Sequence, residues 1–179
     1  GQNGPGVTNL VTGLAQAKAA YIPIVSLGGA LATGHVYRDA FQEVDQQALL
    51  TPITKKTWTV PSTDRVPALV REAFRVANAP RKGPVHLNLP RDVLAGQAVF
   101  DEMPSPNAYR PVGPIAAPDE MIAEAARLLV GAERPVIMVG AGIKNTGAAA
   151  EAIALAEAVN APLVSSPGHG DAIPFGHPL

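Results

Sequence analysis

Three short segments with strand character constrain the fold most, because each follows a segment with helical periodicity. The strand-like segments cover Ile22–Leu27, Thr54–Val60 and Pro84–Pro90. The helical segments cover Thr8–Ala20, Asp39–Leu50 and Arg65–Ala77. The apolar run Ile22–Leu27 is typical of a strand buried on both faces, Thr54–Val60 alternates as a strand does, and Pro84–Pro90 is a strand bounded by prolines. The alternation of helices and strands therefore predicts an α/β fold built on a parallel sheet.

The segment Asp39–Leu50 is predicted to be an amphipathic helix. Its apolar positions are Phe41, Val44, Ala48 and Leu49, and its polar positions are Gln42, Glu43 and Gln46. Apolar side chains at this spacing form one stripe along a helix, which leaves the polar side chains on the other side. Taken alone, the pattern indicates an ordinary helix at the protein surface.

A proline-rich stretch divides the chain. Residues 98–118 contain five prolines and have no periodicity, which predicts a connector between residues 1–97 and residues 119–179. The elements predicted after it are helices over Asp119–Leu129 and Ala148–Val159 and strands over Pro135–Val139 and Ala161–Ser165. The last strand has no helix after it and the first helix has no strand before it. We therefore expect the chain to be part of a longer polypeptide.

Composition argues against several classes of protein. Lys and Arg number 14 against 15 Asp and Glu, so the net charge of -1 gives no electrostatic support for binding nucleic acid or an anionic membrane. No run of about 18 apolar residues could span a bilayer. A hydrophobic fraction of 47% predicts a soluble globular chain, and the absence of cysteine excludes disulfides and fits the cytoplasm. The four histidines lack metal-ligand spacing, so we expect no metal site in this chain.

A glycine-rich turn, Gly4-Pro5-Gly6, runs directly into the first predicted helix. Glycine can approach a ligand closely and take positive φ, proline fixes the turn, and Thr8 or Asn9 can cap the helix. Unpaired N–H groups at a helix start suit a phosphate, a carboxylate or the polar edge of a heterocycle. The alternative is a junction that needs glycine for packing alone, and the short motif by itself favours that alternative.

A second glycine pair, Gly140 and Gly142, follows a predicted buried strand. A dinucleotide could rest its diphosphate at such a turn. The signal is weak, because the third glycine of the dinucleotide-binding fingerprint is missing. The acidic residue expected about 20 positions further on is also missing, since Ala161 and Pro162 occupy that place.

Several segments form a specific combination. They are Asn3–Leu10, Phe41–Asp45, Lys82–Val85 and Leu89–Val93. In sequence and spacing they resemble the pyrimidine-binding domain of thiamine diphosphate enzymes of the acetolactate synthase type. Residues 135–142 and 173–179 are similar to the start of the central domain of that family. Gln2 and Asn3 resemble the sulfoacetaldehyde acetyltransferase branch, so the sub-family stays open.

The resemblance implies a domain arrangement and a function. Residues 1–97 would be the C-terminal part of a pyrimidine-binding domain, residues 98–118 a linker, and residues 119–179 the start of a Rossmann-like central domain. Thiamine diphosphate would lie between subunits of a homodimer or homotetramer. The enzyme would cleave a 2-oxo acid or similar donor and transfer its two-carbon unit. The alternatives are a sulfoacetaldehyde acetyltransferase, a 2-oxo acid decarboxylase or, from another class, a stand-alone nucleotide-binding α/β module.

The resemblance also implies residue roles. Gly6 and Gln42 would act in catalysis, Gly4, Pro5, Gly6 and Asn9 would contact the cofactor, and Phe41 and Gln42 would line the substrate channel. The activating glutamate of the family precedes the glycine turn, and here no acidic residue precedes Asp39. The Mg²⁺ that holds the diphosphate would also be bound outside this chain. FAD is a further cofactor that some members carry, and it would contact Gly140 and Gly142.

Overall fold

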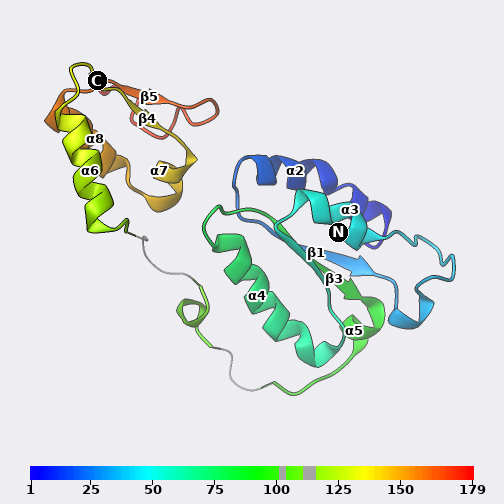
Figure 1. Ribbon diagram of the computed structural model, residues 1–179. Helices are drawn as coiled ribbons and strands as arrows, with labels where there is room; N and C mark the ends of the chain where they lie inside the picture. Colours follow the sequence, from blue (N-terminus) through cyan, green and yellow to red (C-terminus); the bar gives the residue numbers. More distant parts are fainter. Residues whose placement is uncertain (101–103, 111–115) are drawn as a thin grey trace. The chain divides into compact units, whose positions relative to one another are not determined.

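The computed structural model describes residues 1–100, 104–110 and 116–179 (Figure 1). The chain divides into two compact units, Gly1–Val112 and Gly113–Leu179. The predicted connector over residues 98–118 includes residues 101–103 and 111–115, which lie outside the described residues. Each unit is an α/β structure with a parallel sheet, as the sequence predicts.

The first unit contains a three-stranded parallel sheet. Its strands are β1 (Val25–Ala30), β2 (Lys56–Thr59) and β3 (Val85–Pro90). The strand order is β1-β3-β2, so β3 lies in the centre, and every residue of β3 but one is buried. In the register, Asn88 of β3 lies opposite Gly28 of β1 and Thr59 of β2. The carboxyl ends of all three strands therefore meet at one edge of the sheet.

Helices cover both faces of this sheet (Figure 1). On one face lies α4 (Val66–Asn78), and on the other lie α1 (Pro5–Thr8), α2 (Val11–Ala19) and α3 (Gln46–Leu50). The short elements are α5 (Arg91–Ala95) and the 3-10 turns η1 (Thr33–His35), η2 (Thr51–Ile53), η3 (Thr63–Arg65) and η4 (Pro106–Ala108). The core against α4 consists of Val60, Ala73, Ala77, Val85, Leu87 and Val93. The core on the opposite side consists of Val7, Leu14 and Leu50.

Two of the predicted helices differ from the structure. The helix predicted over Thr8–Ala20 is two helices, because the chain turns at Asn9 and Leu10 between α1 and α2. The first turn begins at Pro5, with Gly4 as its N-cap and no side-chain cap, so Thr8 and Asn9 do not cap it. Thr8 Oγ1 instead donates to the carbonyl of Pro5 at 2.9 Å.

The helix predicted over Asp39–Leu50 is wrong in its first half, since only Gln46–Leu50 is helical. The Glu43 carboxylate holds the preceding residues in a loop, because its oxygens accept from Tyr37 N at 2.6 Å and Ala40 N at 3.0 Å. Gln42 has φ 63°, a left-handed conformation that an α-helix excludes. Asp45 then caps α3 by accepting from Ala48 N at 2.9 Å.

The second unit has a two-stranded parallel sheet of β4 (Ile137–Val139) and β5 (Leu163–Ser165). Its helices are α6 (Asp119–Val130), α7 (Ala141–Thr146) and α8 (Ala149–Val159). Val139, Ala152 and Ala172 form its core. Both strands and the helices α6 and α8 lie where the sequence predicts them, whereas α7 begins at the glycine turn and was not predicted.

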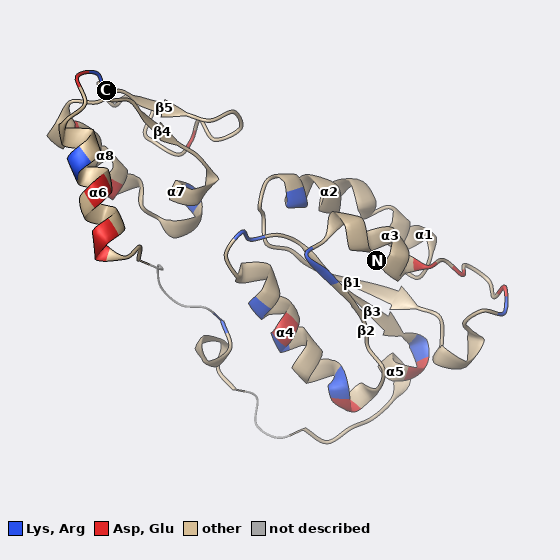
Figure 2. Ribbon diagram, in the orientation of Figure 1, with Lys and Arg blue, Asp and Glu red and all other residues tan. Residues whose placement is uncertain are grey.

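Charged side chains are interspersed in both units. Figure 2 shows Lys and Arg on the same helices as Asp and Glu, most clearly on α4. The ion pairs within helices include Arg75 with Glu72 on α4 and Arg127 with Glu124 on α6. Within the part of the chain that the structure describes, no helix is both long enough and apolar enough to cross a membrane.

Candidate functional site

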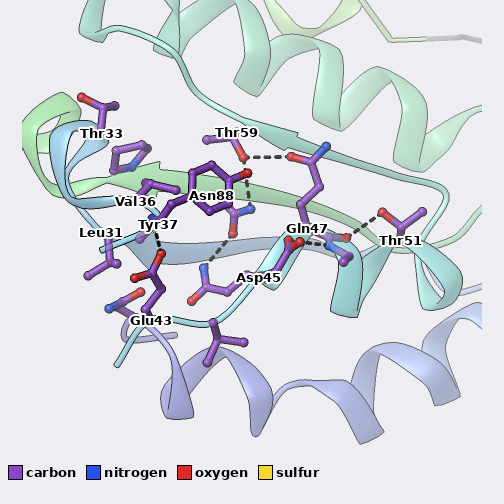
Figure 3. Close-up of a pocket in the computed structure, with 16 residues that line it drawn as sticks. Leu31, Thr33, Val36, Tyr37, Glu43, Asp45, Gln47, Thr51, Thr59 and Asn88 are labelled. Carbon is purple, nitrogen blue, oxygen red and sulfur yellow. Dashed lines mark hydrogen bonds between the residues drawn. The ribbon is translucent and has the colours of Figure 1, made fainter. Parts of the chain in front are cut away.

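A cavity of about 680 Å³ lies at the carboxyl edge of the first sheet (Figure 3). Its walls include Ala30, Thr59 and Pro90, which end β1, β2 and β3. The remaining lining residues are Asn3, Leu31, Thr33, Val36, Tyr37, Glu43, Val44, Asp45, Gln46, Gln47, Ala48, Thr51 and Asn88. In parallel α/β sheets, ligands bind outside the carboxyl ends of the strands, so the cavity has the position of a binding site.

The polar groups of the cavity are mainly amides and hydroxyls. They belong to Asn3, Gln46, Gln47, Asn88, Thr33, Tyr37, Thr51 and Thr59. Among the described lining residues the charged ones are Glu43 and Asp45, and none is basic. Such a lining suits a neutral ring with hydrogen-bonding edges, whereas a diphosphate needs cationic partners or a metal.

The two carboxylates of the cavity are already occupied by backbone groups. Hydrogen bonds from Tyr37 N and Ala40 N lower the pKa of Glu43 below its ordinary value, so this carboxylate is ionised at neutral pH. Asp45 accepts from Ala48 N at the start of α3. Both carboxylates therefore shape the loop, and neither is a free general base.

The glycine turn is fixed from two sides. Gly4 has φ 64°, and its N–H donates to Oε1 of Gln46 at 2.7 Å. A Cβ atom at Gly4 would lie 2.5 Å from the carbonyl oxygen of Gln42, so the position has no room for a side chain. The expectation that the turn offers unpaired N–H groups is therefore wrong for Gly4. Pro5 has no N–H, and the Val7 N–H donates to the Gly4 carbonyl at 3.0 Å.

The structure brings Gln42 together with the glycine turn although 38 positions separate it from Gly4. The Gln42 carbonyl accepts from Nδ2 of Asn3 at 3.3 Å. Phe41, next to it, is 86% exposed. Gly6 packs closely, since a Cβ atom there would lie 2.9 Å from Cβ of Gln2. These residues border the cavity through their neighbours Asn3 and Glu43, and they are not themselves part of its wall.

Asn9 lies elsewhere. It is the C-cap of α1 and lines a second, shallower cavity of about 400 Å³. That cavity also involves Leu10, Leu14 and Leu27 and borders the first half of β1, whereas the first cavity borders its last residue, Ala30. The structure therefore does not bring Asn9 into the cavity at the carboxyl edge of the sheet.

Sequence reasoning missed a buried polar chain behind the cavity. Nε2 of Gln46 donates to Oδ1 of Asn88 at 2.8 Å, and the same oxygen lies 2.9 Å from Nε2 of His86. Since this oxygen accepts, Nε2 of His86 must carry the proton, and Nδ1 accepts from the hydroxyl of Ser26 at 2.7 Å. Burial lowers the pKa of His86, so the ring is neutral. All four side chains are buried.

Two signals in the sequence could have revealed this chain. Gln46 precedes the buried Leu50 by four residues, which places both on one face of a helix. His86 and Asn88 are polar residues within a strand that is otherwise apolar and bounded by prolines. Polar groups in such a strand need hydrogen-bond partners inside the protein.

The second glycine pair has a packing role at one of its two positions. Gly140 is the N-cap of α7, and a Cβ atom there would lie 3.1 Å from Oγ of Ser166. A Cβ atom at Gly142 would meet no other residue within 4 Å. Among the described residues of either unit, no three His, Cys, Asp or Glu side chains gather into a cluster that could hold a metal ion.

Comparison with known families agrees with this geometry. Residues 1–49 match the family described as "Thiamine pyrophosphate enzyme, N-terminal TPP binding domain", and residues 122–179 match "Thiamine pyrophosphate enzyme, central domain". The chain belongs to the thiamine pyrophosphate enzymes. It carries parts of two domains of this family, and the matched ranges include the glycine turn, Gln46 and the second glycine pair.

Individual relatives are similar over nearly the whole chain. A probable acetolactate synthase large subunit of Methanocaldococcus jannaschii is 38% identical over 99% of this chain. The large subunit of acetolactate synthase isozyme 1 of Escherichia coli K12 is 36% identical over 99%, and a glyoxylate carboligase of Escherichia coli O157:H7 is 35% identical over 100%. The chain spans 30%, 31% and 30% of the length of these three relatives.

Proposed function

We propose that the chain works as part of a longer thiamine diphosphate enzyme with acetolactate synthase-like activity. Such an enzyme cleaves a 2-oxo acid and transfers the two-carbon unit to an acceptor. The observation that carries this proposal is the similarity to acetolactate synthase large subunits, which extends through both domains of the chain at 36% to 38% identity. The sheet-edge cavity beside the glycine turn supports it.

The residues present fit one end of the cofactor. The cavity offers amide and hydroxyl groups and no basic side chain among its described residues, which suits the neutral pyrimidine ring. Bound thiamine diphosphate supplies the carbanion-stabilising chemistry of the reaction. Gly4, Pro5 and Gly6 would border its pyrimidine end. Mg²⁺ and the diphosphate would be held by residues outside this chain.

Gln42 and Phe41 are the proposed substrate-side residues. Both belong to the loop that Glu43 fixes, and the Gln42 backbone contacts Gly4 and Asn3. A loop held in this way can place a side chain reproducibly, which catalysis requires. Gly6 would act with Gln42, and Asn9 would contact cofactor atoms only if these reach the second cavity.

Further parts of the proposal concern the whole enzyme. It would be a homodimer or homotetramer in the cytoplasm, with each cofactor between two subunits. FAD would contact Gly140 and Gly142, where an added Cβ atom would lie 3.1 Å from Oγ of Ser166 at Gly140 and meet nothing within 4 Å at Gly142. A bound flavin absorbs at about 450 nm. A purified full-length protein with this absorbance would support FAD, and a colourless protein would oppose it.

The test is an assay of the full-length protein with pyruvate. We expect formation of acetolactate that depends on added thiamine diphosphate and Mg²⁺. Gln42→Ala is expected to lower kcat or raise KM for pyruvate with the fold intact, and Gly6→Val to abolish turnover. Gln16→Ala, at an exposed position of α2, is the control. Cofactor-independent activity, or no activity with any donor, would contradict the proposal.

A second donor has specific support. The similarity to a glyoxylate carboligase is 35% over the whole chain, nearly as high as that to the acetolactate synthases. The same assay with glyoxylate therefore separates the two. A higher kcat/KM for glyoxylate than for pyruvate would assign the chain to a carboligase of that kind. The two remaining reactions to test are acetyl transfer from sulfoacetaldehyde and decarboxylation of a 2-oxo acid without transfer.

A further inference from the structure

Gln46 connects three segments through one buried amide. It is the first residue of α3 and is 3% exposed. Its Oε1 accepts from Gly4 N at 2.7 Å, and its Nε2 donates to Gly29 O at 3.0 Å and to Asn88 Oδ1 at 2.8 Å. One side chain thereby joins the glycine turn to the carboxyl ends of β1 and β3.

The orientation of this amide is determined by its partners. A backbone N–H such as that of Gly4 can only donate, and a carbonyl such as that of Gly29 can only accept. Reversing the amide would place its nitrogen against the Gly4 N–H, another donor, and its oxygen against two other acceptors, Gly29 O and Asn88 Oδ1. Because the site is buried, each unmatched group would keep its full desolvation cost. Only a side chain that places an acceptor beside Gly4 N and a donor beside Gly29 O satisfies both contacts.

The chain of hydrogen bonds behind Gln46 makes the arrangement rigid. Asn88 accepts from Gln46 and from His86, and its Nδ2 donates to Thr59 Oγ1 at 3.3 Å. His86 is in turn held by Ser26. Networks in which every buried group is satisfied fix one conformation of the residues they join.

We propose that Gln46 is a positioning residue, which holds the Gly4 N–H and so fixes the Gly4-Pro5-Gly6 turn relative to the carboxyl edge of the sheet. The inference rests on the proposed function, in which this turn borders the reacting end of the cofactor. Gln46 acts through Gly4, because its amide oxygen and nitrogen are engaged by Gly4 N, Gly29 O and Asn88 Oδ1. A turn displaced by even about 1 Å can lower a catalytic rate about 100-fold.

The test uses Gln46→Glu in the full-length protein. Glutamate has the same shape, and one oxygen can still accept from Gly4 N. The other oxygen faces two acceptors, Gly29 O and Asn88 Oδ1. A buried carboxyl in this position holds its proton more tightly, so its pKa is raised. Protonated, it donates to one of the acceptors and restores the contact, whereas ionised it repels them.

The expected result therefore depends on pH. At alkaline pH, kcat of Gln46→Glu is at least about tenfold below that of the parent, with a smaller change in KM, and it recovers towards acidic pH. Amide hydrogen exchange of the peptide spanning residues 1–10 is at least about fivefold faster than in the parent at the same alkaline pH. The titratable groups bordering Gln46 are Asp45, which caps α3, and His86, which is bonded through Asn88.

The control is Gln16→Glu, which makes the same chemical change at an exposed position of α2. It should leave kcat and the exchange of residues 1–10 as in the parent. Parent-like kcat and exchange in Gln46→Glu at every pH would overturn the inference. A lowered kcat with unchanged exchange and no pH dependence would also overturn it, since the turn would then not have moved.

Failure of the proposed function gives a different result. If the parent has no thiamine diphosphate-dependent activity, the hydrogen exchange alone decides whether Gln46 holds the turn. If Gln46→Glu does not fold, Thr59→Val replaces it, because Thr59 is exposed and its loss frees Nδ2 of Asn88. Exchange of residues 1–10 should then rise about twofold. Unchanged exchange in that folded variant would overturn the inference.

Discussion

Asp92 binds Thr33 through both of its carboxylate oxygens. Oδ1 accepts from Thr33 N at 3.1 Å and Oδ2 accepts from Thr33 Oγ1 at 2.5 Å. Asp92 lies on α5, directly after β3, and Thr33 lies in η1, which follows β1. The contact therefore joins the two segments that leave neighbouring strands at the edge where the cavity lies.

Asp92→Asn should loosen the segment after β1. The amide nitrogen cannot accept a hydrogen bond from Thr33, so we expect amide exchange of residues 31–37 in the full-length protein to be a few-fold faster than in the parent. Asp64→Asn, at an exposed position on η3, is the control. Equal exchange in Asp92→Asn and the parent would show that the loop is held by other contacts.

The contribution of Asp92 to the stability of the folded state should depend on pH. The hydrogen bond from the Thr33 hydroxyl is the main reason why the pKa of Asp92 is below its ordinary value of 3.8. A carboxyl group whose pKa is lower in the folded state stabilises that state at pH values above the unfolded pKa. This stabilisation is lost as pH falls through the folded pKa. The difference in thermal midpoint between parent and Asp92→Asn should therefore narrow as pH falls below the ordinary value of 3.8 and through the lower folded pKa. A constant difference would contradict this.

Gly4→Ala tests the glycine turn by its geometry. An alanine at φ 64° is strained, and its Cβ would lie 2.5 Å from the Gln42 carbonyl oxygen, so we expect a loss of at least about 1 to 2 kcal/mol of stability and of most activity. Gly13→Ala is the matched control, because a Cβ there meets nothing within 4 Å and Gly13 lies inside α2. That variant should gain about 0.5 to 1 kcal/mol. Similar thermal midpoints for both variants would refute the steric argument.

Leu50→Ala tests the core under the turn. Leu50 is fully buried against Val7 of α1 and Leu14 of α2, so truncation leaves a cavity and should cost about 2 to 5 kcal/mol. Leu94→Ala removes the same atoms from a side chain that is 58% exposed and should change stability by less than about 1 kcal/mol. Thermal unfolding of both full-length variants measures the difference, and comparable losses would count against this core.

The regular elements could be predicted from the sequence because their periodicity reflects burial. Helix α4 shows this, since its apolar residues Val66, Leu69 and Val70 pack against the core under β3. The short strands of both units could be predicted from their apolar runs and from the Gly and Pro residues near their ends. Such patterns can be recognised in the local sequence because each element has one face that is buried and another that is less so.

The segment ahead of α3 could not be predicted in this way. Glu43 looks like a solvent-facing helical residue, yet its carboxylate binds two backbone N–H groups on the N-terminal side and stops the helix from starting early. Gln46 has the same appearance, but it is buried. Its partners Gly4 and Asn88 are 42 positions away in either direction. Periodicity carries no information on hydrogen bonds between such distant segments.

The buried histidine gives the last prediction. Burial is the main cause of the lowered pKa of His86, and its hydrogen bond to Asn88 opposes that effect only in part. The unfolded chain therefore binds a proton below about pH 6.5, where the folded state does not. Since stability rises with pH wherever the unfolded state binds more protons, the parent should lose stability as pH falls from about 7 to about 5.5. His86→Gln has no proton to gain at this position, so its stability should fall less over the same range. Thermal unfolding at several pH values measures both slopes, and equal slopes would mean that His86 titrates alike in the folded and unfolded states.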